Sequence, residues 1–199
     1  MIARGQALLA ALQAVPFGDR DAWIDAQLGI EPPPADAADL PRDAVPYLPC
    51  PVDDIVAMVR DAPLRAGDVL VDLGSGLGRV AIIAHLLSGV RAVGVEIQQH
   101  LVERSQRHIA ALGLAAAITI VHGNAADVAV DGSVYFLYAP CNGELLARVV
   151  ERLAAVARRR SIVVCTVGLE LHAPWLVARP TSSVALAVYD AGACYRARP

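Results

Sequence analysis

Apolar residues follow two alternating patterns along most of the chain. Short, mostly apolar runs are typical of buried strands, whereas apolar residues every three or four positions are typical of helices. The strand pattern is found at "DVLVDLG", "RAVGVEI", "AITIVHG", "SVYFLYAP" and "SIVVCTVG", and the helical pattern at "GRVAIIAHLLSG", "QQHLVERSQRHIAALGL" and "GELLARVVERLAAVARRR". This alternation predicts an α/β fold, a doubly wound and mostly parallel sheet with helices on both faces.

The end of the chain departs from this alternation. The segment "WLVARPTSSVALAVYDAGACYRARP" predicts two strands joined by a turn near Pro180–Ser183. We therefore expect an antiparallel final strand in the otherwise parallel sheet. "SVALAVYD" within it is a candidate edge strand for dimerisation, although the sequence leaves the oligomeric state open.

The first part of the chain predicts an extension ahead of the α/β unit. Residues 1–30 read as two short helices separated near "PFGD", and residues 31–51 as an extended connection because their repeated prolines disfavour helix and central strand. "VDDIVAMVRDA" then begins a helix, with Asp53 and Asp54 in its first turn. We expect residues 1–51 to form a helical and proline-rich extension, a candidate lid, and residues 52–199 to form a single domain.

Composition narrows the classes of partner and chemistry. A formal net charge of −3 gives no overall electrostatic footprint for nucleic acid, so a nucleic-acid partner is not expected. The chain has no apolar run long enough to cross a membrane, and its first residues read as an amphipathic helix rather than a signal peptide. The four cysteines form no C-x-x-C pair and the histidines form no metal constellation, so we expect a cytoplasmic protein without a metal. The chain contains no lysine, which excludes Schiff-base and phosphate-loop lysine chemistry.

The stretch "VLVDLGSGLGRV", residues 69–80, carries the strongest chemical signal. Its glycines follow Asp72 at the carboxyl end of a predicted strand and precede a helix, where open α/β sheets bind ligands. Glu96 ends the next strand, where a carboxylate can accept hydrogen bonds from both hydroxyls of a ribose. A dinucleotide site requires G-x-G-x-x-G, but Arg79 stands at the third glycine position and Asp72 would repel a pyrophosphate. A cationic ligand such as S-adenosylmethionine (SAM) fits better, and a nicotinamide oxidoreductase is the alternative that a flat NAD titration would remove.

Three motifs in order, "VLVDLGSGLGRV", "AVGVEI" and "HGNAAD", resemble the class I SAM-dependent methyltransferases over residues 50–190. The resemblance implies a cofactor site whose parts follow the chain. It assigns the methionine part of SAM to Asp72, Gly74, Ser75, Gly76 and Gly78, the ribose to Glu96, and the adenine to Ile97, Asn124 and Ala125. Asn124 departs from the acid that the family often carries there, although an amide oxygen can accept the same hydrogen bond.

The upstream and fourth motifs bear on the methyl acceptor. "YAPC", residues 138–141, lacks the polar first residue and second proline that amino methyltransferases of nucleic-acid bases often carry. "PYLPCPVDDIVAMV" resembles the Tyr-x-Pro-Thr/Ser-Pro segment of small protein-lysine methyltransferases, with Cys50 in place of Thr or Ser. "DLGSGLGRVAIIAHL" with "GVEI" is similar to the non-SET histone lysine methyltransferases. The acceptor expected from this resemblance is a protein amine.

Tyr47 and Tyr138 are the candidate catalytic residues. Tyr47 lies in a proline-stiffened segment that could close over the site, and Tyr138 ends the fourth-motif strand near the expected methyl group. His172, with Glu170 nearby, is a candidate general base. Methyl transfer to an amine needs little more than positioning, which limits how far residue types alone identify the catalytic group.

The predicted function is methyl transfer from SAM, with S-adenosylhomocysteine as product, to a protein lysine. Two alternatives stay open at this point. One is a small-molecule N- or O-methyltransferase, and the other is a SAM-binding protein without turnover.

Overall fold

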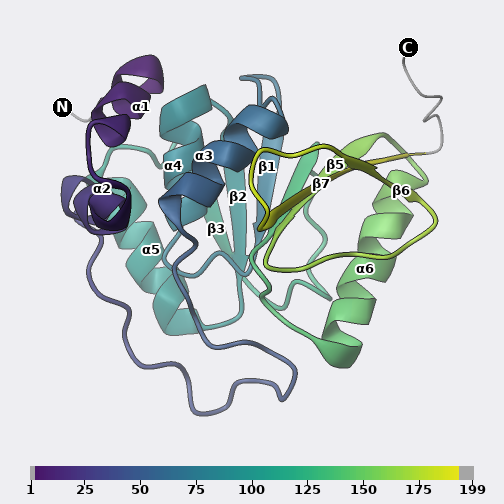
Figure 1. Ribbon diagram of the computed structural model, residues 1–199. Coiled ribbons are helices and arrows are strands. Elements are labelled where there is room, and N and C mark those ends of the chain that lie inside the picture. Colours follow the sequence, from purple (N-terminus) through teal and green to yellow (C-terminus); the bar gives the residue numbers. More distant parts are fainter. Residues whose placement is uncertain (1–2, 193–199) are drawn as a thin grey trace.

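The computed structural model describes residues 3–192 and is built on one seven-stranded sheet of order β3-β2-β1-β4-β5-β7-β6 (Figure 1). Five strands are parallel: β1 Val69–Leu73, β2 Arg91–Glu96, β3 Ile118–His122, β4 Val134–Leu137 and β5 Ile162–Val167. β7 Leu186–Ala191 runs antiparallel to β5 on one side and to β6 Leu176–Arg179 on the other. The prediction of a mostly parallel sheet with an antiparallel final strand is confirmed.

The sheet edge is β6 rather than the segment 183–190 that was the candidate for dimerisation. β7, which contains most of that segment, is an inner strand. Burial on both faces of β7 reflects this inner position. Val188 and Tyr189 point to opposite faces of the sheet, and both are buried. The expectation of an edge strand there is therefore wrong.

Five helices pack on one face of the sheet: α1 Gly5–Gln13, α2 Arg20–Leu28, α3 Val52–Asp61, α4 Arg79–Ser88 and α5 Gln99–Ala111. A short 3₁₀ turn, η1 Phe17–Asp19, separates α1 from α2 at the expected "PFGD". Leu8 of α1 and Ile24 of α2 lie in the same buried cluster as Leu70 of β1. The N-terminal helices therefore complete the core of the α/β unit. None of the helices in the described residues is both long and apolar enough to cross a membrane.

The other face of the sheet is covered by α6 Gly143–Ala157 alone among the described helices (Figure 1). The connection from β3 to β4, residues 123–133, contains no helix, and neither does the connection from β5 to β6, residues 168–175. Helices cover both faces as expected, but on the face of α6 the sheet on either side of this helix is covered by loops.

The topology fixes where a ligand can bind. From β1 the chain passes to β2 on one side, while β4 lies on the other side of β1. Loops that leave the carboxyl ends of β1 and β4 therefore diverge and leave a crevice, the usual ligand site of open α/β sheets. The glycine loop, residues 74–78, and "YAPC" both lie at this crevice.

Candidate cofactor and acceptor site

The glycine loop is shaped by two close contacts. A Cβ on Gly74 would lie 2.4 Å from Cβ of Pro140, and a Cβ on Gly76 would lie 1.9 Å from Cε2 of Tyr47. Both glycines also have positive φ, 87° and 51°. A side chain at either position would be excluded by both space and backbone conformation. Tyr47 and Pro140 therefore lie directly against the loop that the sequence assigned to the cofactor.

Asp72 ends β1 beneath the glycine loop with an unsatisfied carboxylate. Its side chain is 2% exposed, and its Oδ2 has no hydrogen-bond partner among the described residues. Burial, and then the nearby charge of Glu96, raise the pKa of Asp72 to about 8. Ser75 Oγ is likewise buried without a partner in the described part of the chain. Such orphaned polar groups are rare in folded proteins and fit a site completed by a ligand with a positive charge.

Glu96 ends β2 and is tied to the glycine loop. Its Oε2 accepts a hydrogen bond from Gly76 N at 2.8 Å, and its Oε1 accepts one from Gln98 N at 2.8 Å. Burial raises the pKa of Glu96, although backbone N–H groups, including those of Gln98 and Gly76, oppose the rise. A carboxylate offers two acceptor sites on each oxygen, so Glu96 keeps acceptor capacity for a ligand hydroxyl.

Two adjoining hollows extend along the crevice. The larger, of 270 Å³, is lined by Tyr47, Glu96, Ile97 and Tyr138 among others. The smaller, of 40 Å³, is lined by Asn124 and Ala125 and shares Ala44, Gly74, Ile97 and Pro140 with the larger. Their order, from the tyrosines past Glu96 to Asn124, follows the order of amino acid, ribose and base in an adenosyl amino acid. The larger hollow falls just below the roughly 300–1,000 Å³ typical of small-ligand sites.

The residues assigned to the cofactor are not all open to this space. Glu96, Ile97, Gly74, Asn124 and Ala125 line the hollows, whereas Asp72, Ser75, Gly76 and Gly78 do not. The ring of Tyr47 covers Gly76. A ligand that reaches Asp72 must therefore displace this ring.

Residues 31–51, here called the strap, cross the carboxyl edge of the sheet over the crevice (Figure 1). On one side, Asp36 Oδ1 accepts hydrogen bonds from Tyr47 N at 2.9 Å and from Gln98 Nε2 at 2.8 Å. Gln98 Oε1 accepts a third from Ala37 N at 2.7 Å. The backbone N–H of Tyr47 and the amide of Gln98 lower the pKa of Asp36. Gln98 thus fastens the strap to the end of β2.

On the other side, the strap is fastened to the fourth motif. Val45 N donates to Pro140 O at 3.0 Å, and Asn142 N donates to Asp43 O at 2.9 Å. The side chain of Asp43 also accepts a hydrogen bond from Glu144 N, at 3.0 Å, in the first turn of α6. The prolines of the strap predict its extended form, but they give no sign of these partners.

The fourth motif carries the one non-glycine residue with positive φ in the described chain. Ala139 has φ 38°, a conformation that is uncommon outside glycine and costs of the order of 1–3 kcal/mol. It holds Tyr138 on one side and Pro140 on the other against the larger hollow. Burial raises the pKa of Tyr138, so its hydroxyl stays protonated near neutral pH and can donate as well as accept a hydrogen bond.

Arg79, which the sequence analysis treated only as a missing glycine, anchors the N-terminal helices to the glycine loop. Its side chain is 2% exposed, with Nε 2.7 Å from Asp25 Oδ1 and Nη2 2.7 Å from Asp21 Oδ1. Its Nη1 donates to Cys50 O at the end of the strap. Burial would lower the pKa of Arg79, but the two carboxylates raise it. Asp21 and Asp25, four residues apart on a predicted helix, are the available sequence signal, but nothing local identifies their partner.

Other polar side chains, including the candidate general base His172, lie outside the two hollows. His122 contacts Ile97 O through Nε2 at 3.0 Å, and Asp127 pairs with Arg148. His172 and Glu170 lie 3.8 Å apart and line a separate groove. Within residues 3–192, no three His, Cys, Asp or Glu side chains are grouped to hold a metal ion.

Part of the chain is similar in sequence to known methyltransferases. Residues 50–116 match the family model "Histone methylation protein DOT1". A protein-lysine N-methyltransferase of Saccharolobus islandicus is 35% identical over 85 residues, 42% of this chain and 53% of that protein. The ribosomal RNA small subunit methyltransferase A of Leifsonia xyli is 41% identical over 73 residues, 36% of this chain and 26% of that protein. The chain thus spans about half or less of the length of these curated relatives.

Solved structures extend the similarity to most of the fold. An RNA methyltransferase from Salinibacter ruber, in complex with S-adenosyl-L-homocysteine, covers 72% of this chain and 92% of its own, with a TM-score of 0.58 and 23% identity. A putative methyltransferase from Escherichia coli covers 75% of this chain and 90% of its own, with a TM-score of 0.60 and 18% identity. At these identities the likeness concerns the fold.

Proposed function

We propose that this chain, which belongs by fold and motifs to the class I SAM-dependent methyltransferases, transfers the methyl group of SAM to the side-chain amine of a lysine in a protein substrate. The observation that carries the proposal is the pair of buried carboxylates, Asp72 and Glu96, at the ends of adjacent strands around the glycine loop. Asp72 lacks a partner that a cationic amino acid would supply, and Glu96 faces a hollow with free acceptor sites.

The residues present fit SAM. Asp72 would hold its ammonium group, Glu96 its ribose hydroxyls, and Ile97 and Ala125 the faces of its adenine. Asn124 Oδ1 already accepts a hydrogen bond from Ala126 N at 2.9 Å, so its second acceptor site would serve the adenine amino group. When bound, SAM supplies an activated methyl group on a sulfonium.

The part of this chain in the reaction is to position the acceptor. A lysine amine attacks only after losing its proton, so the site must hold the neutral amine in line with the methyl group. Tyr138 borders the hollow and would help to orient that amine. The amine would take the methyl group as its bond to sulfur breaks, the electron pair of that bond would stay on sulfur, and the methylated ammonium would pass a proton to water.

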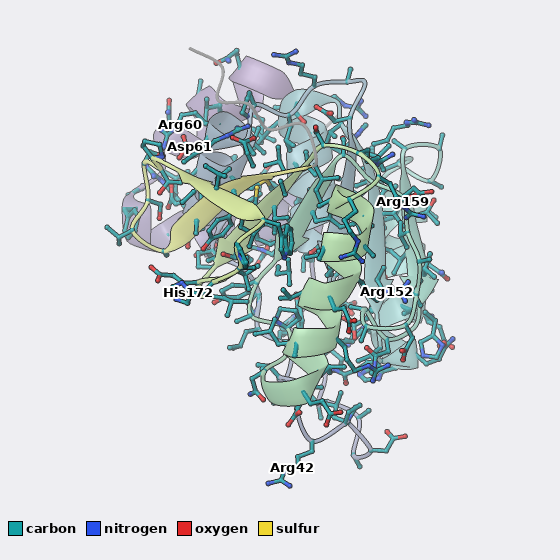
Figure 2. All side chains as sticks on the ribbon, turned by 90° about the vertical axis from the view of Figure 1, so that its right-hand side faces the viewer. Arg42, Arg60, Asp61, Arg152, Arg159 and His172 are labelled. Carbon is teal, nitrogen blue, oxygen red and sulfur yellow. The ribbon has the colours of Figure 1, made fainter. Side chains whose placement is uncertain are left out.

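Charge around the crevice favours a cationic acceptor over RNA. The strap carries four acids, Glu31, Asp36, Asp39 and Asp43, against one arginine, Arg42, and of these acids Glu31 is paired with Arg104 of α5. The arginine run 158–160 follows α6, which begins at the carboxyl edge of the sheet and ends at the opposite edge. Figure 2 shows Arg159 at the end of α6 away from Arg42 of the strap. An RNA methyltransferase needs positive charge beside its active site to bind phosphates.

The test is to incubate the purified protein and methyl-labelled SAM with a protein extract. We expect label that protease removes and ribonuclease leaves, and that appears in methyl-lysine after hydrolysis. Asp72→Asn should abolish the labelling, and Asp127→Asn, at an exposed position outside the hollows, should keep it. Label in RNA or only in small molecules would contradict the proposed acceptor.

A further inference from the structure

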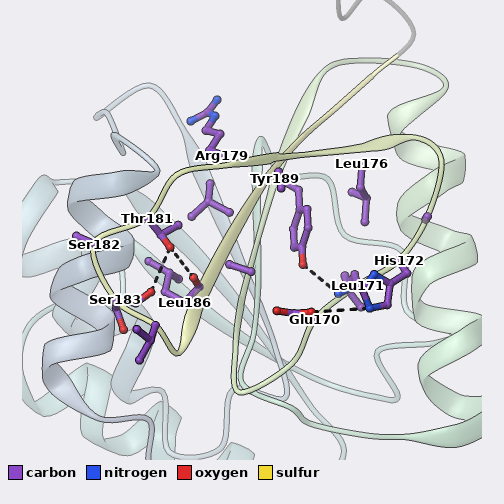
Figure 3. Close-up of a pocket in the computed structure, with 15 residues that line it drawn as sticks. Glu170, Leu171, His172, Leu176, Arg179, Thr181, Ser182, Ser183, Leu186 and Tyr189 are labelled. Atoms are coloured by element: carbon purple, nitrogen blue, oxygen red, sulfur yellow. Dashed lines mark hydrogen bonds and ion pairs between the residues drawn. The ribbon is translucent and has the colours of Figure 1, made fainter.

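A groove of 760 Å³ opens beside the cofactor site, between the loop after β5 and the β6–β7 hairpin (Figure 3). The groove exists because the connection 168–175 contains no helix that would cover the sheet beside β5 and β7. Its floor includes Tyr189, whose hydroxyl accepts a hydrogen bond from Leu171 N at 3.0 Å and so fixes the loop to β7. Thr181 closes the hairpin end by donating to Leu186 O at 2.9 Å.

The groove meets the cofactor site at Gly168. Gly168 lines the larger hollow of the crevice, and Glu170, two residues further on, lines the groove. Gly168 N also donates to Ala185 O at 2.9 Å, which places the hairpin at the same sheet edge. A chain lying in the groove would therefore pass next to the position from which a side chain can enter the crevice.

Among the charged side chains of the groove, the carboxylate of Glu170 faces solvent. Arg179 is held by Asp190, with Nε 2.6 Å from Oδ2. Glu170 is 78% exposed, and its contact with His172, at 3.8 Å, is an ion pair only when the imidazole is protonated. With the acids of the strap, Glu170 makes the approach to the crevice negative.

Two exposed apolar side chains border the same approach. Val184, at the hairpin end, is fully exposed and lines the groove, and Leu48 of the strap is 62% exposed and lines the larger hollow. Exposed apolar groups next to a carboxylate suit a polypeptide better than a small polar amine, because they offer contacts to several successive side chains.

We propose that the groove binds the polypeptide flanking the target lysine, with Glu170 pairing with a basic residue near that lysine and Val184 contacting an apolar one. This inference rests on the proposed function. It identifies the acceptor as a cationic, extended segment of another protein, since the chain itself contains no lysine to offer.

The experiment uses synthetic peptides with one central lysine in an alanine background. Each flanking position is replaced in turn by arginine, glutamate or leucine, and methylation is followed with labelled SAM. We expect wild type to prefer arginine at one flanking position by about threefold, the range of an exposed ion pair. Glu170→Gln should remove that preference, and Glu170→Arg should reverse it toward glutamate, while the KM for SAM stays unchanged. Glu151→Gln, at an exposed position on α6, is the matched control and should keep it.

A second measurement separates docking from turnover. Binding of a fluorescein-labelled arginine-containing peptide, in the presence of S-adenosylhomocysteine, should weaken about threefold in Glu170→Gln and in Val184→Ser, and not in Glu151→Gln. Peptide methylation with a flanking preference that survives Glu170→Gln would overturn the inference and leave the methyl-transfer function intact. Methylation of free lysine as fast as of every peptide would also overturn the inference, because no flanking segment would then matter. Absence of SAM binding and of any labelled product would overturn the proposed function, and the inference with it.

Discussion

The ring of Tyr47 lies against Gly76 so closely that a Cβ on Gly76 would sit 1.9 Å from the tyrosine Cε2. This contact joins the strap to the glycine loop at the place assigned to the methionine part of SAM. The ring occupies the space that a side chain would need, and a ligand could reach the loop at Gly76 only after the ring has moved.

Gly76→Ala should destabilise the protein by more than its backbone strain. A left-handed alanine costs about 1–2 kcal/mol, and the overlap with Tyr47 should add about 1–3 kcal/mol, as in overpacked cores. Gly89→Ala is the control, because Gly89 has φ 77° with nothing within 4 Å of its Cβ position. Urea unfolding should show the larger loss for Gly76→Ala. In a Tyr47→Ala background, the further loss caused by Gly76→Ala should fall to the Gly89→Ala value. Equal losses in the single variants Gly76→Ala and Gly89→Ala would contradict the contact.

Stability should fall with rising pH because of Asp72. Its pKa is raised from 3.8 to about 8, so between these values the folded protein holds a proton that the unfolded chain has lost. Raising the pH through this window therefore favours unfolding. Asp72→Asn has no such proton, and its stability relative to wild type should increase from about pH 4 to about pH 8. Parallel stability curves for the two proteins, measured by urea unfolding without SAM, would refute the assignment.

SAM binding should release a proton from Asp72. The cofactor ammonium prefers the ionised carboxylate, so the affinity should rise from pH 6 to pH 7 by up to about tenfold, and less in Asp72→Asn. Calorimetry at pH 7 in buffers of different ionisation enthalpy should give close to one proton released for wild type. An affinity that does not change with pH, and no difference between buffers, would show that Asp72 does not face the bound ligand.

Gln98→Leu should release the strap. It removes the amide that donates to Asp36 and accepts from Ala37 N. We expect trypsin to cleave after the exposed Arg42 about tenfold faster, since each lost hydrogen bond is worth about 0.5–1.5 kcal/mol. Gln99→Leu is the control, because the side chain of Gln99 donates to Glu103 of its own helix and not to the strap. Equal cleavage in both variants would mean that the strap is held elsewhere.

Arg79→Met should loosen the N-terminal helices. It leaves Cys50 O and two carboxylates without their shared partner, but Asp21 and Asp25 are partly exposed and can be hydrated. We therefore expect a loss below the about 3–5 kcal/mol of a broken buried pair, nearer 2 kcal/mol. Arg148→Met, which breaks an exposed pair with Asp127, should cost at most about 1 kcal/mol. Urea unfolding distinguishes the two, and equal costs would show that Arg79 adds no more than a surface pair.

The strands and helices could be predicted from the sequence because each depends on a local pattern. Gly89 and Gly113 end their helices, and Asp72 and Glu96 end strands whose parallel pairing brings them to one edge. The positions of the cofactor candidates follow from that edge. The contacts of these candidates with the strap do not follow from the same patterns.

Partners far apart in the sequence left no local signal. Arg79 meets Asp21 across 58 positions, and Gln98 meets Asp36 across 62. An arginine or glutamine at either position is equally compatible with an exposed helix end. The identity of the edge strand was missed for a related reason, because nothing within "SVALAVYD" shows that β6 pairs along its outer side.

The strap also precedes every element to which it is fastened, and this has a consequence for biosynthesis. Asp43 and Glu144 are 101 positions apart, so at about 5–20 residues per second the strap leaves the ribosome roughly 5–20 seconds before its last anchor. During that interval the buried leucines of α1 and α2 have only part of their final surroundings. The strap is therefore made early in synthesis and is among the last segments to gain all of its contacts.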